Sequence, residues 1–487
     1  MPAARPLALG ALLVLTACGE RATPAAAPSP FSARVDSAVA DAMKDGLVPG
    51  LAVTIVRGDS VLHSKGYGFA NLEQRVPMTD STPVVIGSTS KTVTSFAIMQ
   101  LVDSGKVALD STVFRYVHVL SGPGAPRPAD PRFGRMTVRH LLTNVGGIPA
   151  GFSGDPFEVL DTATTALEDL VRHDMLPRRL DFAPGTGYRY SNRGFSLASL
   201  VVQDVSGVSY EDYIDTRIFA PLGMRHSTGR FWNGPGRGMV QGYRETTEGK
   251  PVAMPAALAR SWTGSGMILS TSHDAARFMQ AILNGGQAPG GPRVLSAASA
   301  AEILRAQQDA ESEMGGPTKY GLAWEISSMN GTTIAMKGGS VVAMGSLFVM
   351  LPGQKVGVAM VFNAIDYGKL GLLANLLKIL AGAPTDPYKP LPVAPPVPPS
   401  EVTLPATTMQ RVAGTYETMS GLMRVELRGD TLAGRWEGDD IRLEPTSDSS
   451  FVVRSRIREM EGTPVTIRPC SRTLCMWIKG DSNAVRR

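Results

Sequence analysis

The sequence predicts a mixed α and β protein: an antiparallel sheet, flanked by helices and carrying a helical lobe, followed by a small all-β, barrel-like domain. Two observations lead to this fold class. Strand-like runs gather near both ends of the stretch 32–383 while helix-like runs fill its middle, as in a sheet made from both ends of a chain. The stretch 400–487 holds only short alternating or β-rich runs separated by turns. The length of 487 residues and the hydrophobic content of 43% are enough for two such domains.

Residues 1–17 have the features of an export signal. Arg5 precedes an apolar run that is too short to span a bilayer, and small residues follow that run. The next residues, 18–31, are rich in Ala and Pro and offer little to bury, which predicts a tether. Leu15-Thr16-Ala17-Cys18 resembles the lipobox of bacterial lipoproteins, in which the Cys is acylated and becomes the mature N-terminus. The alternative is an ordinary signal peptide with an incidental Cys.

The lipobox resemblance implies a membrane partner, reached through a lipid on Cys18. Gly19 follows that Cys in place of Asp, which among such lipoproteins favours the outer membrane. The expected location is therefore the periplasmic face of the outer membrane in a bacterial cell envelope. Without the lipid, the protein would be periplasmic or secreted.

The elements of the stretch 32–383 follow from periodicity and punctuation. A helix is expected over 37–45, and strands over 50–56 and 60–67 are joined by a hairpin signal. Further helical patterns cover 137–142, 166–175, 193–205, 210–219, 274–283 and 296–307, two of them preceded by the capping-box residues Ser209 and Thr271. Three strands in a meander and one helix end the stretch, at 332–336, 346–351, 356–362 and 367–380.

Ser88-Thr89-Ser90-Lys91 is the stretch around which the chemistry is organised. A strand-like run breaks at Gly87, and a nearly continuous apolar run then predicts a buried helix from about Ser88 to Gly105. Ser88 and Lys91 are one helical turn apart, so both project from the same face, and the N–H groups of a helix start can bind a developing oxyanion. The alternative is a Ser that caps a core helix while Lys91 extends to solvent.

Two later motifs add polar side chains to this picture. Tyr190 and Asn192 follow a Gly-rich turn that leads into a helix, a position that can aim a phenol and an amide into a cleft. The alternative is turn chemistry, with Asn192 capping the helix. Lys337-Gly338-Gly339-Ser340 ends a predicted strand with a cation and two residues without side chains, where a substrate backbone could lie along the strand edge. The alternative there is a Lys that protects a sheet edge.

The order Ser-x-x-Lys, Tyr-x-Asn, Lys-Gly-Gly resembles the β-lactamase-related serine hydrolases over about residues 32 to 380. That group contains class C β-lactamases, D-alanyl-D-alanine peptidases, D-aminopeptidases and certain esterases. Flanking segments match as well: 49–53, 140–143, 221–224, 266–271 and 320–324. The resemblance implies the β-lactamase/transpeptidase-like fold and an acyl-enzyme mechanism without a cofactor, acting on a small-molecule or peptide substrate.

The resemblance also implies a role for each motif residue. Ser88 would attack the substrate carbonyl, and Lys91 or Tyr190 would take and relay its proton. Asn192 would orient the substrate, Lys337 would bind a substrate carboxylate, and the strand at Gly339 and Ser340 would line the site. The oxyanion hole would consist of the backbone N–H groups of Ser88 and Ser340.

Two departures from the family pattern bear on which class of substrate is expected. Gly338 replaces the Thr or Ser that usually follows this Lys, which removes a hydroxyl that helps to hold a substrate carboxylate. The segment 144–147, Asn-Val-Gly-Gly, replaces the more usual His-Thr-Ser-Gly. Both weaken the expectation of an efficient β-lactamase, so an esterase or a D-amino-acid peptidase or amidase is at least as well supported. A catalytically inactive binding or scaffolding lipoprotein is the alternative from another class.

Other function classes lack support in the sequence. The net charge of +5 is spread along the chain without basic runs, which disfavours nucleic-acid binding. No Gly-x-Ser-x-Gly or His-Glu-x-x-His motif occurs, and the six His are dispersed, so no metal site is expected. Cys470 and Cys475 are close in sequence and, in an oxidising compartment, predict a local disulfide.

The second domain is set off by residues 384–399, where eight of sixteen positions are Pro, a density that predicts an extended linker. Short strands are expected after it at 412–416, 423–427, 431–436, 441–444, 451–455, 465–468 and 474–478, in a small sandwich or barrel. The pattern is similar to the lipocalin-like domain often attached to this hydrolase family. Its role, whether substrate lip, packing or oligomer contact, stays open, as does the oligomeric state.

Overall fold

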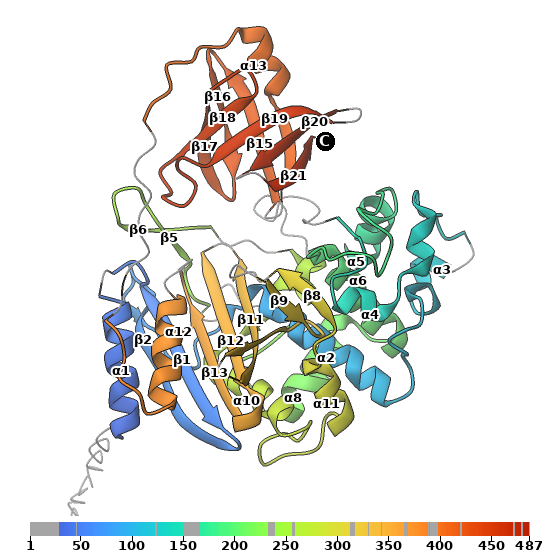
Figure 1. The fold of residues 1–487 in the computed structure, drawn as a ribbon, viewed down its shortest axis with the longest axis vertical. Coiled ribbons are helices and arrows are strands. Elements are labelled where there is room, and N and C mark those ends of the chain that lie inside the picture. The colour runs from blue at the N-terminus through green and yellow to red at the C-terminus, as the bar shows by residue number, and fades with distance from the viewer. Residues whose placement is uncertain are drawn as a thin grey trace, which may run out of the picture.

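The protein folds into a large α/β body and a smaller β-barrel (Figure 1). The computed structural model describes residues 29–44, 46–121, 124–149, 166–231, 239–255, 259–311, 317–329, 331–341, 343–364, 369–387, 389, 398–418, 421–470, 473–478 and 481–486. The predicted fold class is confirmed. The predicted signal peptide, Cys18 and most of the linker lie outside the described residues. No helix in the described part combines the length and apolarity that a membrane crossing requires.

A nine-stranded antiparallel sheet forms the centre of the large body within the described residues, in the order β3-β2-β1-β13-β12-β11-β10-β9-β8. The strands are β1 Gly50–Arg57, β2 Ser60–Asn71, β3 Val76–Pro77, β8 Gln308–Glu311, β9 Pro317–Tyr320, β10 Glu325–Met329, β11 Thr332–Val341, β12 Met344–Leu351 and β13 Val356–Phe362. Leu51 of β1 lies opposite Phe362 of β13, so the two ends of the body meet in the middle of the sheet, as the sequence predicts.

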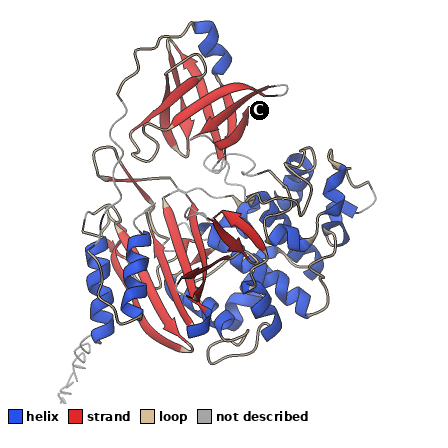
Figure 2. Ribbon diagram, in the orientation of Figure 1, coloured by secondary structure: helices blue, strands red, loops and turns tan. Residues whose placement is uncertain are grey.

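Alternating side chains of the central strands serve two different cores. Leu51, Val53 and Ile55 of β1 face the helices α1 (Pro30–Ala42) and α12 (Lys369–Leu380). Ala52 and Val56 face the opposite side, toward α2 (Ser90–Asp103) and α10 (Ser272–Leu283). The period of two in a strand therefore produces a three-layer body, with helices on both faces of the sheet (Figure 2).

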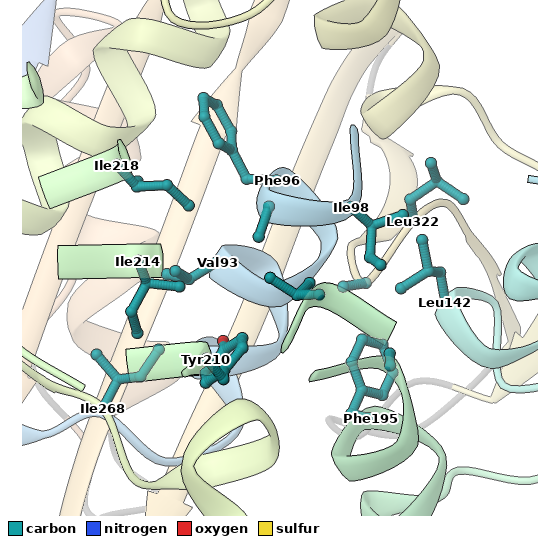
Figure 3. Packing of buried hydrophobic residues seen from close by; sticks show 14 of the residues in the cluster. Val93, Phe96, Ile98, Leu142, Phe195, Tyr210, Ile214, Ile218, Ile268 and Leu322 are labelled. Carbon is teal, nitrogen blue, oxygen red and sulfur yellow. The ribbon is translucent and has the colours of Figure 1, made fainter. Parts of the chain in front are cut away.

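The helical lobe packs around α2, which is buried on nearly all sides. Val93, Phe96 and Ile98 of α2 lie among Leu142, Phe195, Tyr210, Ile214 and Leu322 from the surrounding helices and loops (Figure 3). The other helices of the body are α3 His118–Ser121, α4 Val138–Leu142, α5 Ala166–Asp169, α6 Asn192–Ser206, α7 Tyr210–Ile214, α8 Ala220–Leu222, α9 Thr263–Gly266 and α11 Ala297–Leu304. Short turns of helix lie at η1 Gly87–Thr89, η2 Val113–Arg115, η3 Pro131–Arg135, η4 Leu170–Met175, η5 Asp215–Phe219, η7 Arg260–Trp262 and η8 Pro352–Gln354.

Helix starts agree with the predicted caps, with one correction. The Oγ of Ser209 and the Oγ1 of Thr271 accept hydrogen bonds from Asp212 and Asp274, as the capping patterns predict. The first helix, expected from residue 37, already begins at Pro30, because Ser29 caps it and Pro favours the first helical position. That helix includes the last two residues of the predicted tether.

The C-terminal body is a closed barrel of eight antiparallel strands in the described part of the chain. The strands are β14 Gly414–Thr418, β15 Gly421–Arg428, β16 Thr431–Trp436, β17 Asp439–Pro445, β18 Ser450–Ser455, β19 Pro464–Cys470, β20 Thr473–Ile478 and β21 Asp481–Arg486. A helix, α13 (Ala406–Val412), precedes them, so the expected strand start at residue 412 is wrong; α13 and β21 were not predicted. Cys475 is disulfide-bonded, whereas the side chain of Cys470 lies outside the described part, so their pairing stays a prediction.

Two small antiparallel pairs complete the body. The strands β4 (Val84–Val85) and β7 (Leu269–Ser270) join the entry of α2 to the segment after α9. The strands β5 (Tyr243–Glu245) and β6 (Pro251–Ala253) form a hairpin that lies between the sheet and the barrel (Figure 1).

Candidate active site

Ser88 lies in a tight turn at the entry of α2. The turn η1 precedes the helix, which begins at Ser90, two residues later than the prediction. Gly87 takes a φ of +56°, which a residue with a side chain rarely adopts. Ser88 is partly exposed, whereas Thr89, Ser90 and Lys91 are buried, so the turn presents one hydroxyl at the surface of the site.

Lys91 is fully buried below that hydroxyl. Its Nζ donates hydrogen bonds to Ser88 Oγ at 3.1 Å, to Asn192 Oδ1 at 2.7 Å and to the Ser265 carbonyl at 2.5 Å. Three acceptors match the three donors of an ammonium group. The alternative in which Lys91 extends to solvent is therefore wrong, because α6 and α9 enclose the side chain.

Tyr190 approaches the same hydroxyl from the other side. Its OH donates to Ser88 Oγ at 2.6 Å. The loop that carries Tyr190 is held by Asn144, whose carbonyl accepts from the Arg189 N–H at 2.8 Å and whose Oδ1 accepts from the Ser191 N–H at 3.1 Å. Asn144 itself takes a φ of +57°, a conformation that Asn tolerates better than most residues. The unusual segment 144–147 thus supports the phenol.

Ser191, and not Asn192, caps the start of α6. The Oγ of Ser191 accepts from the Gly194 N–H and so caps α6, which corrects the alternative in which Asn192 is the cap. Asn192 is buried at the first helical position, where its Oδ1 accepts from Lys91. This arrangement leaves the amide –NH2 group to donate to a ligand.

Lys337 faces the site from β11, whose strand runs on to Val341 and does not end at this Lys as predicted. The side chain is fully buried, so it does not protect a sheet edge. Its Nζ lies 4.7 Å from the centre of the Tyr190 ring and 5.5 Å from that of Tyr320. Lys91 lies 4.8 Å from the same Tyr190 ring, so two ammonium groups flank one phenol and stabilise negative charge on its oxygen.

Glu325 is a site residue that sequence reasoning missed. Its Oε1 lies 4.0 Å from Lys337 Nζ, and its side chain is only 3% exposed. Glu325 begins β10 and directly follows residues 320–324, the segment that resembles the hydrolase family. A carboxylate among apolar residues was the one feature of the sequence that could have pointed to it. A buried carboxylate beside a buried ammonium offsets part of the positive charge of the ammonium. The positive charge that Lys337 presents to the site is therefore reduced by its ion pair with Glu325.

The two glycines of the site permit a close approach of backbones. A Cβ on Gly339 would lie 2.1 Å from the Ile86 carbonyl oxygen and 2.8 Å from the Ser88 N, and a Cβ on Gly87 would lie 2.4 Å from the Ser340 N. Neither position has room for a side chain. As a result, the N–H groups of Ser88 and Ser340 come from two adjacent backbone segments, as an oxyanion hole requires.

The strand β11 extends beyond its pairing with β10. In the described chain, β10 pairs with β11 only between Thr332 and Met336, whereas β12 pairs with β11 as far as Val341. Among the described residues, no strand continues β10 beside the stretch from Gly338 to Val341, in which Ser340 is exposed. An extended substrate could add its backbone there.

A buried ion pair joins Arg193, at the start of α6, to Asp174. Arg193, 1% exposed, donates through Nε to Asp174 Oδ2 and through a terminal nitrogen to the Pro149 carbonyl at 3.3 Å. It immediately follows Asn192 in α6, so it fixes the start of the helix that carries the amide. The sequence held no sign of this pair, because Asp174 lies in a different helical segment.

The predicted residues are thus brought together, while their roles stay predictions. Ser88, Lys91, Tyr190 and Asn192 form one hydrogen-bonded cluster, and Lys337, Gly339 and Ser340 border it from β11. Within the described residues, no group of three or more His, Cys, Asp or Glu side chains is placed to hold a metal ion.

Comparisons with known proteins identify the family to which the large body belongs. The family model described as Beta-lactamase matches residues 35–383. Protein flp of Staphylococcus aureus (strain MW2) is 23% identical over 330 residues, which is 68% of this chain and 62% of that protein, so the chain spans about three fifths of that relative's length. Penicillin-binding protein 4 of Amycolatopsis lactamdurans is 30% identical over 390 residues, covering 77% of this chain and 94% of the relative.

Solved structures share the fold. The octameric penicillin-binding protein homologue from Pyrococcus abyssi superposes with a TM-score of 0.62 at 24% identity, over 93% of this chain and 99% of that one. A class C β-lactamase superposes with a TM-score of 0.59 at 21% identity, over 74% of this chain and 98% of that one. The first of these alignments extends through most of the chain, whereas the second covers a smaller part.

Replacing Gly339 with Ala tests the close approach of β11 and η1. The new Cβ would overlap the Ile86 carbonyl, so β11 must move away from Ser88. We expect the rate of hydrolysis of an activated ester to fall by about 10²- to 10³-fold, the usual effect of losing one oxyanion donor. Gly353→Ala is the matched control, because a Cβ there meets nothing within 4 Å. Equal activity of the two variants would contradict the assignment.

Proposed function

Because the chain belongs to the β-lactamase family, we propose that it is a serine hydrolase that works through an acyl-enzyme on Ser88. The observation that carries the proposal is the contact of Ser88 Oγ with Lys91 Nζ at 3.1 Å and Tyr190 OH at 2.6 Å. A hydroxyl becomes a strong nucleophile only when a neighbouring group removes its proton. Both groups that could do so lie within hydrogen-bond reach.

The reaction would proceed in two halves. Ser88 Oγ attacks the substrate carbonyl while its proton passes to deprotonated Tyr190 or Lys91, and the N–H groups of Ser88 and Ser340 stabilise the oxyanion. The tetrahedral intermediate then collapses, the same residue gives its proton to the leaving group, and Ser88 remains acylated. In the second half, a water molecule attacks the acyl carbonyl and loses its proton to that residue, which then returns the proton to Ser88 Oγ as the acid leaves.

For the substrate, we propose an ester or amide that lacks a carboxylate beside the scissile bond. Lys337 is fully buried with Glu325 next to it, and Gly338 offers no hydroxyl, so a substrate carboxylate finds little exposed positive charge. A D-amino-acid peptide or a penicillin is the second candidate. It is favoured by the likeness to penicillin-binding protein 4 and by the end of β11 around Ser340, which extends beyond its pairing with β10.

Replacing Ser88 with Ala tests the acyl-enzyme. We expect hydrolysis of p-nitrophenyl acetate to fall by at least about 10³-fold and the fluorophosphonate adduct to vanish from the intact mass, because the nucleophile is gone. The control is Ser95→Ala on the same helix, since the Oγ of Ser95 is buried and without a hydrogen-bond partner in the described structure. Wild-type protein that forms no adduct would instead support an inactive binding or scaffolding protein.

Replacing Glu325 with Gln tests the substrate preference. Removing the carboxylate leaves more of the Lys337 charge uncompensated, so kcat/KM for nitrocefin, which carries a carboxylate, should rise about tenfold relative to p-nitrophenyl acetate, a change of about 1.4 kcal/mol. Glu426→Gln, on the exposed face of the barrel, changes the net charge equally and should leave the ratio unchanged. A ratio that stays at the wild-type value in Glu325→Gln rejects the preference.

We also propose that the protein is a lipoprotein on the periplasmic face of the outer membrane of a bacterial cell. The lipobox-like residues that end at Cys18 support this location. Replacing Cys18 with Ser removes the acylated thiol, so the protein should move from the membrane to the soluble fraction on ultracentrifugation, because a single bound lipid anchor would be lost. Persistence in the membrane fraction would argue against the anchor.

A further inference from the structure

The β5–β6 hairpin is anchored in the hydrolase body. The Tyr243 N–H donates to the Asn363 carbonyl at 2.8 Å, at the end of the central strand β13. The phenol of Tyr243 accepts from the Leu72 N–H at 2.7 Å and donates to Glu73. The hairpin base is therefore fixed to both β13 and the end of β2.

The barrel joins this hairpin through its backbone. The segment between β18 and β19 lies antiparallel to the end of β5, with an isolated bridge between Thr246 and Ile457. The Thr247 N–H donates to the Arg456 carbonyl at 2.8 Å, and the Arg458 N–H donates to the Glu245 carbonyl at 2.9 Å. Strand-like pairing of this kind fixes direction and register between the two bodies.

Arg244 is the electrostatic centre of the junction. Its side chain is 4% exposed and forms ion pairs with Glu437 and, at 2.6 Å between Nε and Oε1, with Glu459 of the barrel. One terminal guanidinium nitrogen of Arg244 pairs with Glu437, and the other lies 3.4 Å from the Met460 sulfur. Removing one partner of a buried ion pair leaves an uncompensated charge, so this contact strongly resists separation.

The same junction encloses the turn between β11 and β12. Ala343, at φ +64° in that turn, is fully buried and belongs to the apolar cluster of the barrel, together with Met254 after β6. Its carbonyl accepts from the Tyr243 N–H at 3.3 Å, and a Cβ on Gly242 would lie 2.9 Å from the same oxygen. The hairpin and the barrel thus hold the turn from two sides.

The turn follows β11, the strand that carries the Ser340 N–H. Ser340 pairs with Gly345 across the turn, so a displacement of Ala343 is transmitted directly to the Ser340 N–H. The barrel itself has a packed interior, with buried Met423, Leu443 and Phe451 in one cluster. Such an interior suits a rigid support.

We propose that the barrel is a clamp on the β11–β12 turn, locked by Arg244, and that it holds the Ser340 N–H in its catalytic position. Arg244 is then a positioning residue that acts through the turn. This inference rests on the proposed function for its effect on rate, but not for its effect on the turn. It assigns the barrel a part in transition-state stabilisation, which depends on preorganised donors.

The test replaces Arg244 with Met, which keeps the length and removes the charge. We expect kcat for p-nitrophenyl acetate to fall about 10- to 100-fold with KM changed less than about threefold, because a misplaced oxyanion donor affects the transition state more than substrate binding. Amide hydrogen exchange over residues 340–346 should become faster in the same variant, since the turn loses its support.

Two further variants make the result decisive. Arg454→Met is the matched control, because Arg454 also binds two carboxylates, Glu444 and Glu461, but both belong to the barrel. Glu459→Gln is a milder change at the junction, should Arg244→Met fail to fold. Unchanged exchange over 340–346 in the junction variants, or equal effects in Arg454→Met, would overturn the clamp. If wild-type protein neither hydrolyses esters nor labels at Ser88, the proposed function fails, while the exchange data still decide on the clamp.

Discussion

The close approach of two backbone segments, Gly87–Ser88 and Gly339–Ser340, is the constraint on which the site depends. Side chains at either glycine would collide with the opposite backbone. The approach is held by two buried hydroxyls, since Thr89 Oγ1 and Ser346 Oγ each donate to the Ile86 carbonyl at 2.7 Å. The turn that carries the nucleophile is thereby hydrogen-bonded to β12, which pairs with the strand that carries the Ser340 N–H.

The positive charge around the phenol is offset only in part by a neighbouring carboxylate. Two ammonium groups, Lys91 and Lys337, flank Tyr190, and one carboxylate, Glu325, lies beside the second of them. A low-dielectric interior makes each of these interactions stronger than it would be in water. In the proposed mechanism, the proton of Ser88 passes directly to Lys91 or Tyr190, both of which lie within hydrogen-bond distance of its Oγ.

The sequence predicted those parts of the structure that local chemistry determines. Ser88 and Lys91 could be paired because one helical turn separates them, and Tyr190 and Asn192 could be added because the order of the three motifs resembles that of the β-lactamase-related hydrolases. The strands β1, β2 and β13 could be predicted because apolar runs and turn residues mark them. Ion pairs between residues far apart in the sequence could not be foreseen. Glu325 matters only because β10 lies beside β11, and Arg244 only because a barrel packs on its hairpin. The helix α13 and the strand β21 were missed because short polar segments carry little periodicity.

The pairing of β1 with β13 has a consequence for how the chain reaches its native state. Leu51 meets Phe362 in the centre of the sheet, so the core of the body cannot close until a ribosome has synthesised nearly all of it. Contacts of such long sequence separation fold slowly, and the unpaired edge of β1 stays open to other strands until then. A sheet that joins both ends of a polypeptide thus leaves an incomplete chain exposed to aggregation.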